Sequence, residues 1–380
     1  ALNGSIAGGE YNVAIGNSTL AALTSGDNNT VVGYNAGTAV TTADRNTMVG
    51  YGAGSAMTTG EKNVFVGYNA GLSGTSGSGV RNVGVGNQAL LSLTDGQRNT
   101  AVGFTAGQLI TTGENNIAIG YSAANGFDTE NHNLAIGTDA LGGSVAGGEY
   151  NIAIGNASLD ALTSGDNNTV VGYNAGTAVT TAAKVTALGG FACQSVTTGG
   201  SNIGIGYNAN GGSNDETNNL GIGVDALTGS VNGGEYNIAI GNSSLDALTS
   251  GDQNVAMGYA AGGALNSGSN NVFIGNSAGI AQTTASNNVL IGGDAGAAIT
   301  TGGSNVFIGY TAGDGHDTEG SNLGIGVSAL GGAIAGGEFN VAVGNSSGED
   351  LTSADHTAMV GYQAGANVTE GSGSTFMGYQ

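Results

Sequence analysis

Apolar and polar residues follow a short cycle along this chain. Two β-branched residues at alternate positions enclose a small or aromatic one, as in Val13-Ala14-Ile15, Val64-Phe65-Val66 and Val306-Phe307-Ile308, and a glycine follows each triplet. Alternation with a period of two residues is typical of a β-strand. The pattern therefore predicts one strand of about five residues in every cycle, for example residues 63–67.

The glycine that follows the strand, here called the anchor glycine, sets the length of the cycle. It recurs from Gly16 to Gly378, and of its twenty-one intervals seventeen are 17 residues, three are 18 and one is 19. A period held so strictly is the signature of a solenoid, in which each repeat is one coil stacked on the next. We therefore expect residues 1–380 to form a single continuous array, an all-β parallel β-solenoid or β-roll of about 22 coils.

The rest of each cycle predicts how a coil closes. A small residue such as Ala36 or Ala106 follows the anchor glycine and indicates a bend. A second short strand is predicted to run into a threonine pair, as in residues 40–42, and a polar turn such as 113–115 leads to the next coil. Each coil should thus hold two short strands, with a longer turn in the 18-residue coils. Frequent glycines and the lack of a 3.6-residue period exclude helices.

An asparagine opens the first strand in nineteen of the twenty-two coils, and Val185, Thr357 and Ser374 replace it in the others. Stacked asparagines can bond their amides to the coils on either side, so a structural ladder is predicted rather than a catalytic role. The asparagines of this ladder are Asn12, Asn29, Asn46, Asn63, Asn82, Asn99, Asn116, Asn133, Asn151, Asn168, Asn202, Asn219, Asn237, Asn254, Asn271, Asn288, Asn305, Asn322 and Asn340.

Composition limits the kind of protein this can be. There are 76 glycines, no proline and no tryptophan, and only 8% of the residues are charged, so the core must be thin and assembly should supply further burial. The formal net charge of -22 argues against nucleic acid or an anionic membrane as a partner. No apolar stretch approaches the roughly 20 residues that cross a bilayer, so no membrane contact is expected within this segment. The single cysteine, Cys193, is predicted to be a small packed residue.

A tyrosine follows the anchor glycine in many coils and should form a stripe. Such a stripe would either pack between chains or stack on sugar rings and other partners, and the packing role is favoured. Its members are Tyr34, Tyr51, Tyr68, Tyr121, Tyr173, Tyr207, Tyr259, Tyr310 and Tyr362.

Acidic turns are the candidates for a metal site, because carboxylate oxygens suit a hard cation. Their spacing matches no known calcium loop, so solvated turns are favoured, and calcium is the only cofactor considered. The candidate ligands are Asp128, Glu130, Asp215, Glu216, Asp314, Asp317 and Glu319. No nucleophile lies near a base at motif spacing, so no enzymatic activity is expected.

The threonine pairs suggest an alternative, because they should align along one edge of the solenoid as an ice-binding surface does. The file is interrupted, which weakens this interpretation; the interrupting residues are Asp128, Asn214, Asn266, Gln282 and Asp317.

The pattern N-[VT]-A-[IV]-G-x-x-A, seen at residues 99–103 and 151–155, resembles the YadA-like head repeats of trimeric autotransporter adhesins, and related repeats occur in phage tail-fibre-like proteins. The resemblance implies a left-handed parallel β-roll, three parallel chains, display outside the cell and adhesion to surfaces, matrix or other cells. The coil of this chain is longer than the coil of those heads.

Together these features favour a structural, adhesive segment of an extracellular surface fibre, cut from a longer chain. It should associate with itself, as a parallel homotrimer or an end-to-end filament, and bind a surface glycan or a matrix ligand. A phage or phage-like tail fibre on a virion is the first alternative, and an ice-binding solenoid is the second.

Overall fold

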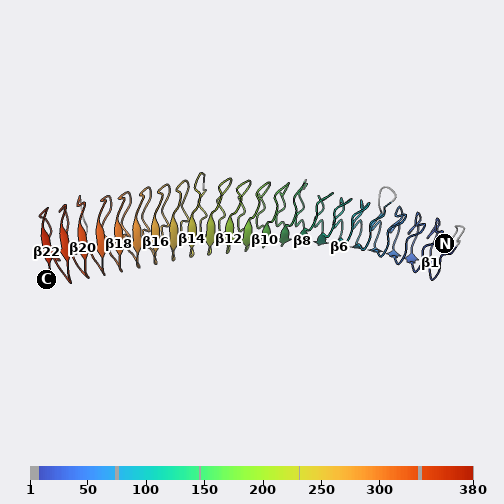
Figure 1. Ribbon diagram of the computed structural model, residues 1–380, viewed down its shortest axis with the longest axis horizontal. Helices are drawn as coiled ribbons and strands as arrows, with labels where there is room; N and C mark the ends of the chain where they lie inside the picture. The colour runs from blue at the N-terminus through green and yellow to red at the C-terminus, as the bar shows by residue number, and fades with distance from the viewer. Residues whose placement is uncertain (1–7, 73–76, 145–146, 231, 333–335, 380) are drawn as a thin grey trace. The chain divides into compact units, whose positions relative to one another are not determined.

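The structure is a computed structural model that describes residues 8–72, 77–144, 147–230, 232–332 and 336–379. It divides the chain into two compact units, Ala1–Gly190 and Phe191–Gln380, which are described separately. The described residues contain no helix, and 22 parallel strands form a β-solenoid with a period of about 17 residues (Figure 1). The fold class predicted from the anchor glycines is therefore confirmed.

Every strand is three residues long. In unit 1 the strands are β1 (Val13–Ile15), β2 (Thr30–Val32), β3 (Thr47–Val49), β4 (Val64–Val66), β5 (Val83–Val85), β6 (Thr100–Val102), β7 (Ile117–Ile119), β8 (Leu134–Ile136), β9 (Ile152–Ile154), β10 (Thr169–Val171) and β11 (Thr186–Leu188). In unit 2 they are β12 (Ile203–Ile205), β13 (Leu220–Ile222), β14 (Ile238–Ile240), β15 (Val255–Met257), β16 (Val272–Ile274), β17 (Val289–Ile291), β18 (Val306–Ile308), β19 (Leu323–Ile325), β20 (Val341–Val343), β21 (Ala358–Val360) and β22 (Thr375–Met377).

Strands of successive coils pair in parallel and in register within each unit. Thr47 of β3 lies opposite Val64 of β4, 17 residues on. The same register holds across an 18-residue coil, where Leu134 lies opposite Ile152, and across the 19-residue coil, where Val64 lies opposite Val83. The extra residues are therefore accommodated outside the strands, as the sequence predicted.

The prediction of two strands per coil is wrong, because each coil contains one. The segment containing Val40 and Thr41, predicted as a second strand, consists of turns and bends. Just before it, Asn35 and Gly37 both have φ of 55°, and left-handed residues at alternate positions prevent the extended backbone that a strand requires. The segment still bonds to the next coil, since the Thr41 N–H donates to the Thr58 carbonyl oxygen at 3.0 Å.

The anchor glycine allows the coils to approach closely where the strand ends. Gly275 has φ of 142°, and a Cβ at this position would lie 2.3 Å from the carbonyl oxygen of Gly292 in the next coil. Only glycine fits both the backbone angle and the available space. This explains why the residue recurs in every coil.

The core is one side chain thick and its volume is balanced within each coil. Phe307 at the centre of β18 fills the space left by Gly313, where a Cβ would lie 2.3 Å from the ring. Where the strand centre is Gly324, Leu330 is buried at the position equivalent to Gly313. Cys193 is fully buried at this same position in its own coil, and burial raises the pKa of its thiol to about 12. It is an inert packing residue.

Candidate functional site

The asparagine ladder connects each turn to the strand of the neighbouring coil. The Asn271 side chain donates from Nδ2 to the Ala285 carbonyl oxygen at 2.9 Å and to Asn254 Oδ1 at 3.0 Å. Its Oδ1 accepts the N–H of Asn288 at 2.9 Å. Eighteen of the nineteen ladder asparagines are buried, and Asn12 is half-buried. Because each amide satisfies buried backbone groups on both sides, the ladder is structural.

The coil in which Val185 replaces the asparagine shows how the ladder tolerates a gap. The Val185 N–H still donates to Asn168 Oδ1 at 2.8 Å, but valine has no amide to offer the coils beyond it. In unit 2, Asn202 Nδ2 donates to the Gly199 carbonyl oxygen at 3.0 Å. Gly199 lies 14 residues after Val185, the separation at which a ladder asparagine normally donates.

The calcium candidates include three glutamates that fasten the longer coils. Glu319 is buried, and its Oε2 accepts the N–H of Asp317 at 2.9 Å while its Oε1 accepts the N–H of Gly336 at 3.0 Å. Glu130 and Glu216 make the equivalent bonds. All three lie one coil before an 18-residue interval. The carboxylates therefore hold the loop that contains the extra residue.

Electrostatics agrees with this structural role. Burial alone would raise the pKa of Glu319, but hydrogen bonds from the backbone of Asp317 and Gly336 hold it below its usual value. Asp215 is on the surface, and hydrogen bonds from the Thr197 and Thr198 hydroxyls lower its pKa.

The remaining aspartates do not converge on a cation. Asp128 and Asp317 accept hydrogen bonds from Thr111 and Thr300, and burial raises the pKa of Asp314. Within the described ranges, no group of three or more His, Cys, Asp or Glu side chains could hold a metal ion.

The threonine file is bonded along the solenoid edge, as where Thr24 Oγ1 donates to the Thr41 carbonyl oxygen at 3.0 Å. Asp128 continues this file, but the placement of Gln282 in it is wrong. Gln282 is fully buried in the core, at the position that Ile299 fills in the next coil. Neither polar atom of its amide has a hydrogen-bond partner among the described residues.

The tyrosine stripe is exposed in the isolated chain. The exposed fractions of its nine members run from 48% to 60%. Tyr34, Tyr51 and Tyr68 stack in succession with ring centroids 5.2 Å apart. Phe104, which the sequence analysis omitted, continues the stripe by stacking on Tyr121 at 5.4 Å.

The sequence analysis overlooked the outer face of the strands. The middle residue of each strand points into the core, and its two neighbours face outward, as in β7, where Ile117 is 40% and Ile119 is 38% exposed. The third strand residue is Val, Ile, Leu or Met in all 22 strands. We call this surface the strand face. The signal was present, because the residues on both sides of the inward one are apolar, whereas a solvated face would be polar.

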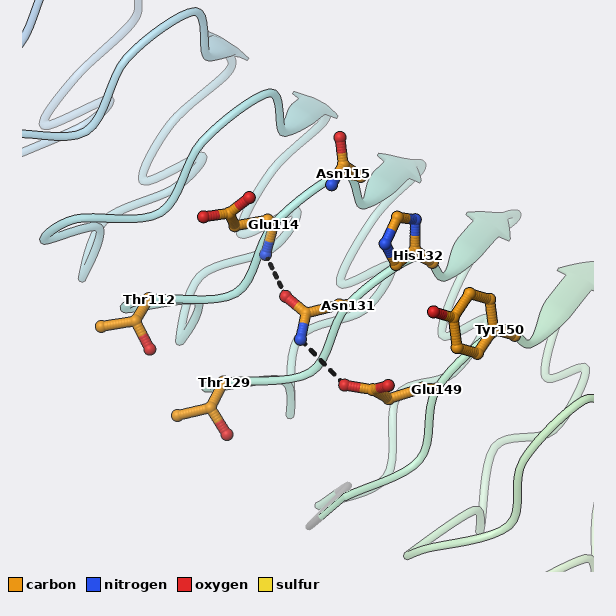
Figure 2. Close-up of a pocket in the computed structure, with 8 residues that line it drawn as sticks. All are labelled: Thr112, Glu114, Asn115, Thr129, Asn131, His132, Glu149 and Tyr150. Carbon is orange, nitrogen blue, oxygen red and sulfur yellow. Dashed lines mark hydrogen bonds between the residues drawn. The ribbon is translucent and has the colours of Figure 1, made fainter.

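A polar groove of about 450 Å³ lies on the outer turns of unit 1, between the coils of β7 and β9 (Figure 2). Asn131 lies at its centre, with its Oδ1 accepting the Glu114 N–H at 2.7 Å and its Nδ2 donating to Glu149 at 2.8 Å. On one side the His132 and Tyr150 rings stack at 4.9 Å and 5°. Two carboxylates, an amide and two rings can bind a polar ligand.

Comparison with known proteins adds no identity. No model of a protein family matches the chain, and none of the curated proteins matches it. In the described part of the chain, no helix has the length and apolar character that crossing a membrane requires.

Proposed function

We propose that this chain is a structural, adhesive segment of an extracellular fibre, in which copies associate through the strand face. The observation that carries the proposal is the unbroken apolar third position of the strands. Exposed members such as Ile119 and Ile154 belong to eleven successive coils of unit 1. Repeated over that many coils, the face exceeds the roughly 300–600 Å² of contiguous apolar surface that a soluble monomer exposes.

A second copy of the chain is the partner that best fits this face. The apolar positions recur once per coil, at the strand spacing of about 4.8 Å. A partner can follow such a face over many coils only if its own contacts recur at the same spacing, which a copy of the same repeat provides. Association would also supply burial that the thin core lacks. This arrangement places the self-association seam on the strand face rather than on the tyrosine stripe.

The adhesive role rests on the surfaces that such an assembly leaves outside. The stacked rings of Tyr34, Tyr51 and Tyr68 and the polar groove beside Tyr150 offer flat aromatic surface next to polar groups. Aromatic side chains of this kind contribute large contact area at interfaces. A fibre on a virion would use the same assembly.

The experiment is the mass of the chain in solution, measured by light scattering at micromolar concentration. The wild type is expected at a multiple of 36.5 kDa, and three strand-face substitutions should return it to one chain with unchanged circular dichroism. The face variant is Ile119→Glu, Ile136→Glu and Ile154→Glu. The control variant, which adds equal charge at exposed turns, is Ser25→Glu, Thr42→Glu and Thr59→Glu.

Adhesion is measured as the retention of coated beads on a matrix-coated surface under flow. Beads that carry the wild type or the control variant should be retained, and beads that carry the face variant should be released. A monomeric wild type would refute the assembly, and equal retention of beads with and without the chain would refute the adhesive role.

A further inference from the structure

All five cations of the chain occupy one position of the repeat, directly before the ladder residue. They lie in unit 1, and unit 2 has no lysine or arginine. Four belong to successive coils, those of β3 to β6. The five cations are Arg45, Lys62, Arg81, Arg98 and Lys184. We call the first four the cation file.

The fold does not require a cation at this position. The backbone there is left-handed, with φ of 58° at Arg45 and 60° at Arg81. Other coils carry Asn115, Gln253 or Ser304 at the same position with similar φ. Asparagine adopts this conformation more readily than a long side chain does, so local structure favours the uncharged choice. A residue that departs from the local preference without structural gain indicates a functional demand.

The cations also repel one another. Strands β3 to β6 pair in register, so equivalent residues of successive coils lie about 4.8 Å apart, and like charges at that spacing are unfavourable. Lys62 Nζ lies 3.4 Å from Glu61, and Arg98 lies 2.6 Å from Glu114. Arg45 and Arg81 have no carboxylate within 4 Å among the described residues. An external anion would relieve this repulsion.

The file leads directly into the polar groove. After Arg98 the same repeat position is occupied by Asn115, His132 and Tyr150, and these three side chains line the groove in Figure 2. The hydroxyl of Thr129 faces the same space. An amide, a hydroxyl and an exposed aromatic ring are the groups that bind a sugar, since its hydroxyls form hydrogen bonds and its C–H face packs on a ring.

We propose that the cation file and the groove form a track for an acidic polysaccharide that lies along the stacked coils. Its carboxylate or sulfate groups would pair with the four cations, and a sugar ring would pack beside His132 and Tyr150. The coil spacing is comparable to the rise of one sugar residue in an extended glycan. The inference rests on the proposed adhesive function, for which it names the ligand class.

Nucleic acid fits this track less well. A nucleic-acid strand carries one phosphate per about 3.4 Å, a denser negative charge than four cations can neutralise. Asp44 and Glu61 also border the file and would repel it. A glycan with one acidic group every few sugars avoids this repulsion.

The test measures binding of the full chain to immobilised hyaluronate, dextran sulfate, uncharged dextran and an oligothymidylate. The track variant is Arg45→Gln, Lys62→Gln and Arg81→Gln, since glutamine already occupies this position at residue 253. The control variant makes the same change in net charge at exposed sites of unit 2, through Ser250→Glu, Ser267→Glu and Thr301→Glu.

We expect the wild type to bind at least one of the two acidic glycans and to ignore uncharged dextran. The track variant should bind about tenfold more weakly, the order expected for three exposed ionic contacts, and its dependence on salt should be shallower by about three contacts. The control variant should bind within about threefold of the wild type. The mass in solution should be the same for all three, which separates this inference from self-association through the strand face.

A second pair of variants tests the groove. Tyr150→Leu should weaken binding of the acidic glycan without changing its salt dependence, and Tyr236→Leu, the equivalent change in unit 2, should not. Failure of the wild type to bind either acidic glycan, or equal binding by the track variant, would overturn the proposal. Preference for oligothymidylate, or a lower mass of the track variant in solution, would overturn it in favour of a nucleic-acid site or a contact between copies.

Discussion

Asn271→Ala removes one member of the ladder from the middle of unit 2. The substitution deletes the Nδ2 donor to the Ala285 carbonyl oxygen and the Oδ1 acceptor of the Asn288 N–H, at 2.9 Å each. Both backbone groups belong to buried residues. They have no other hydrogen-bond partner among the described residues.

The structure itself indicates how much of this loss can be recovered. In the coil that follows Val185, Asn202 Nδ2 donates to the carbonyl three residues before it. Asn288 stands in the same relation to Ala285, so it can rescue that carbonyl but not its own N–H. A buried unsatisfied group costs about 1–3 kcal/mol, and with the lost side-chain volume we expect a local destabilisation of about 2–4 kcal/mol.

Amide hydrogen exchange is the suitable assay, because a repeat protein opens locally rather than in one step. Protection of the amides from Val272 to Ile291 should fall by a factor of about 30 to 1,000, since 1.4 kcal/mol corresponds to tenfold. Asn276→Ala, at an exposed asparagine in the same coil, should change protection less than threefold.

The rescue makes a further prediction. The double variant with Asn288→Ala also loses the substitute donor, so it should be less stable than the sum of the single changes. Equal protection in Asn271→Ala and Asn276→Ala would refute the structural role of the ladder.

Three further predictions concern other parts of the core. Gly275→Ala should disrupt its coil, because its φ is 142° and the new Cβ would meet a carbonyl oxygen at 2.3 Å, whereas Gly263→Ala should not; limited proteolysis would show the difference, and equal resistance would contradict it. Burial lowers the pKa of His316 to about 4 from 6.5, so the unfolded state binds the proton more readily and stability should fall by up to ~3 kcal/mol as pH drops from 6.5 to 4. His316→Leu should remove that part of the pH dependence in acid-unfolding curves, and an unchanged curve would contradict it. Glu319→Gln should speed exchange of the Gly336 amide at neutral pH; because the pKa of Glu319 is lowered, acid below its usual value should do the same to the wild type, and a Gly336 amide that is insensitive to both would count against the bond.

The sequence predicted the solenoid because its period is visible without any knowledge of contacts. Residues 17 apart, such as Thr47 and Val64, repeat the same role, so parallel pairing in register follows directly. The ladder asparagines could be placed for the same reason. The tyrosine stripe could be located as a file, but its exposure could not, because the direction of a side chain depends on where the coil closes.

The threonine file shows where this reasoning ends. Gln282 falls next to the threonines in the sequence, yet it points into the core, because the turn preceding it reverses the expected orientation. The second strand was mispredicted for a related reason, since left-handed residues such as Asn35 occupy a stretch whose composition suits a strand. Side-chain alternation indicates a face only where the backbone is extended.

By itself the sequence determined the period, the register and the file to which most residues belong, because these follow from repetition along the chain. Only the tertiary structure decided what the files do. It placed the carboxylate of Glu130 on the backbone of the following loop, left the strand face without a partner, and joined the cation file to the groove beside Tyr150. The physical reason is that burial and hydrogen bonding depend on neighbouring coils, which a single repeat does not contain.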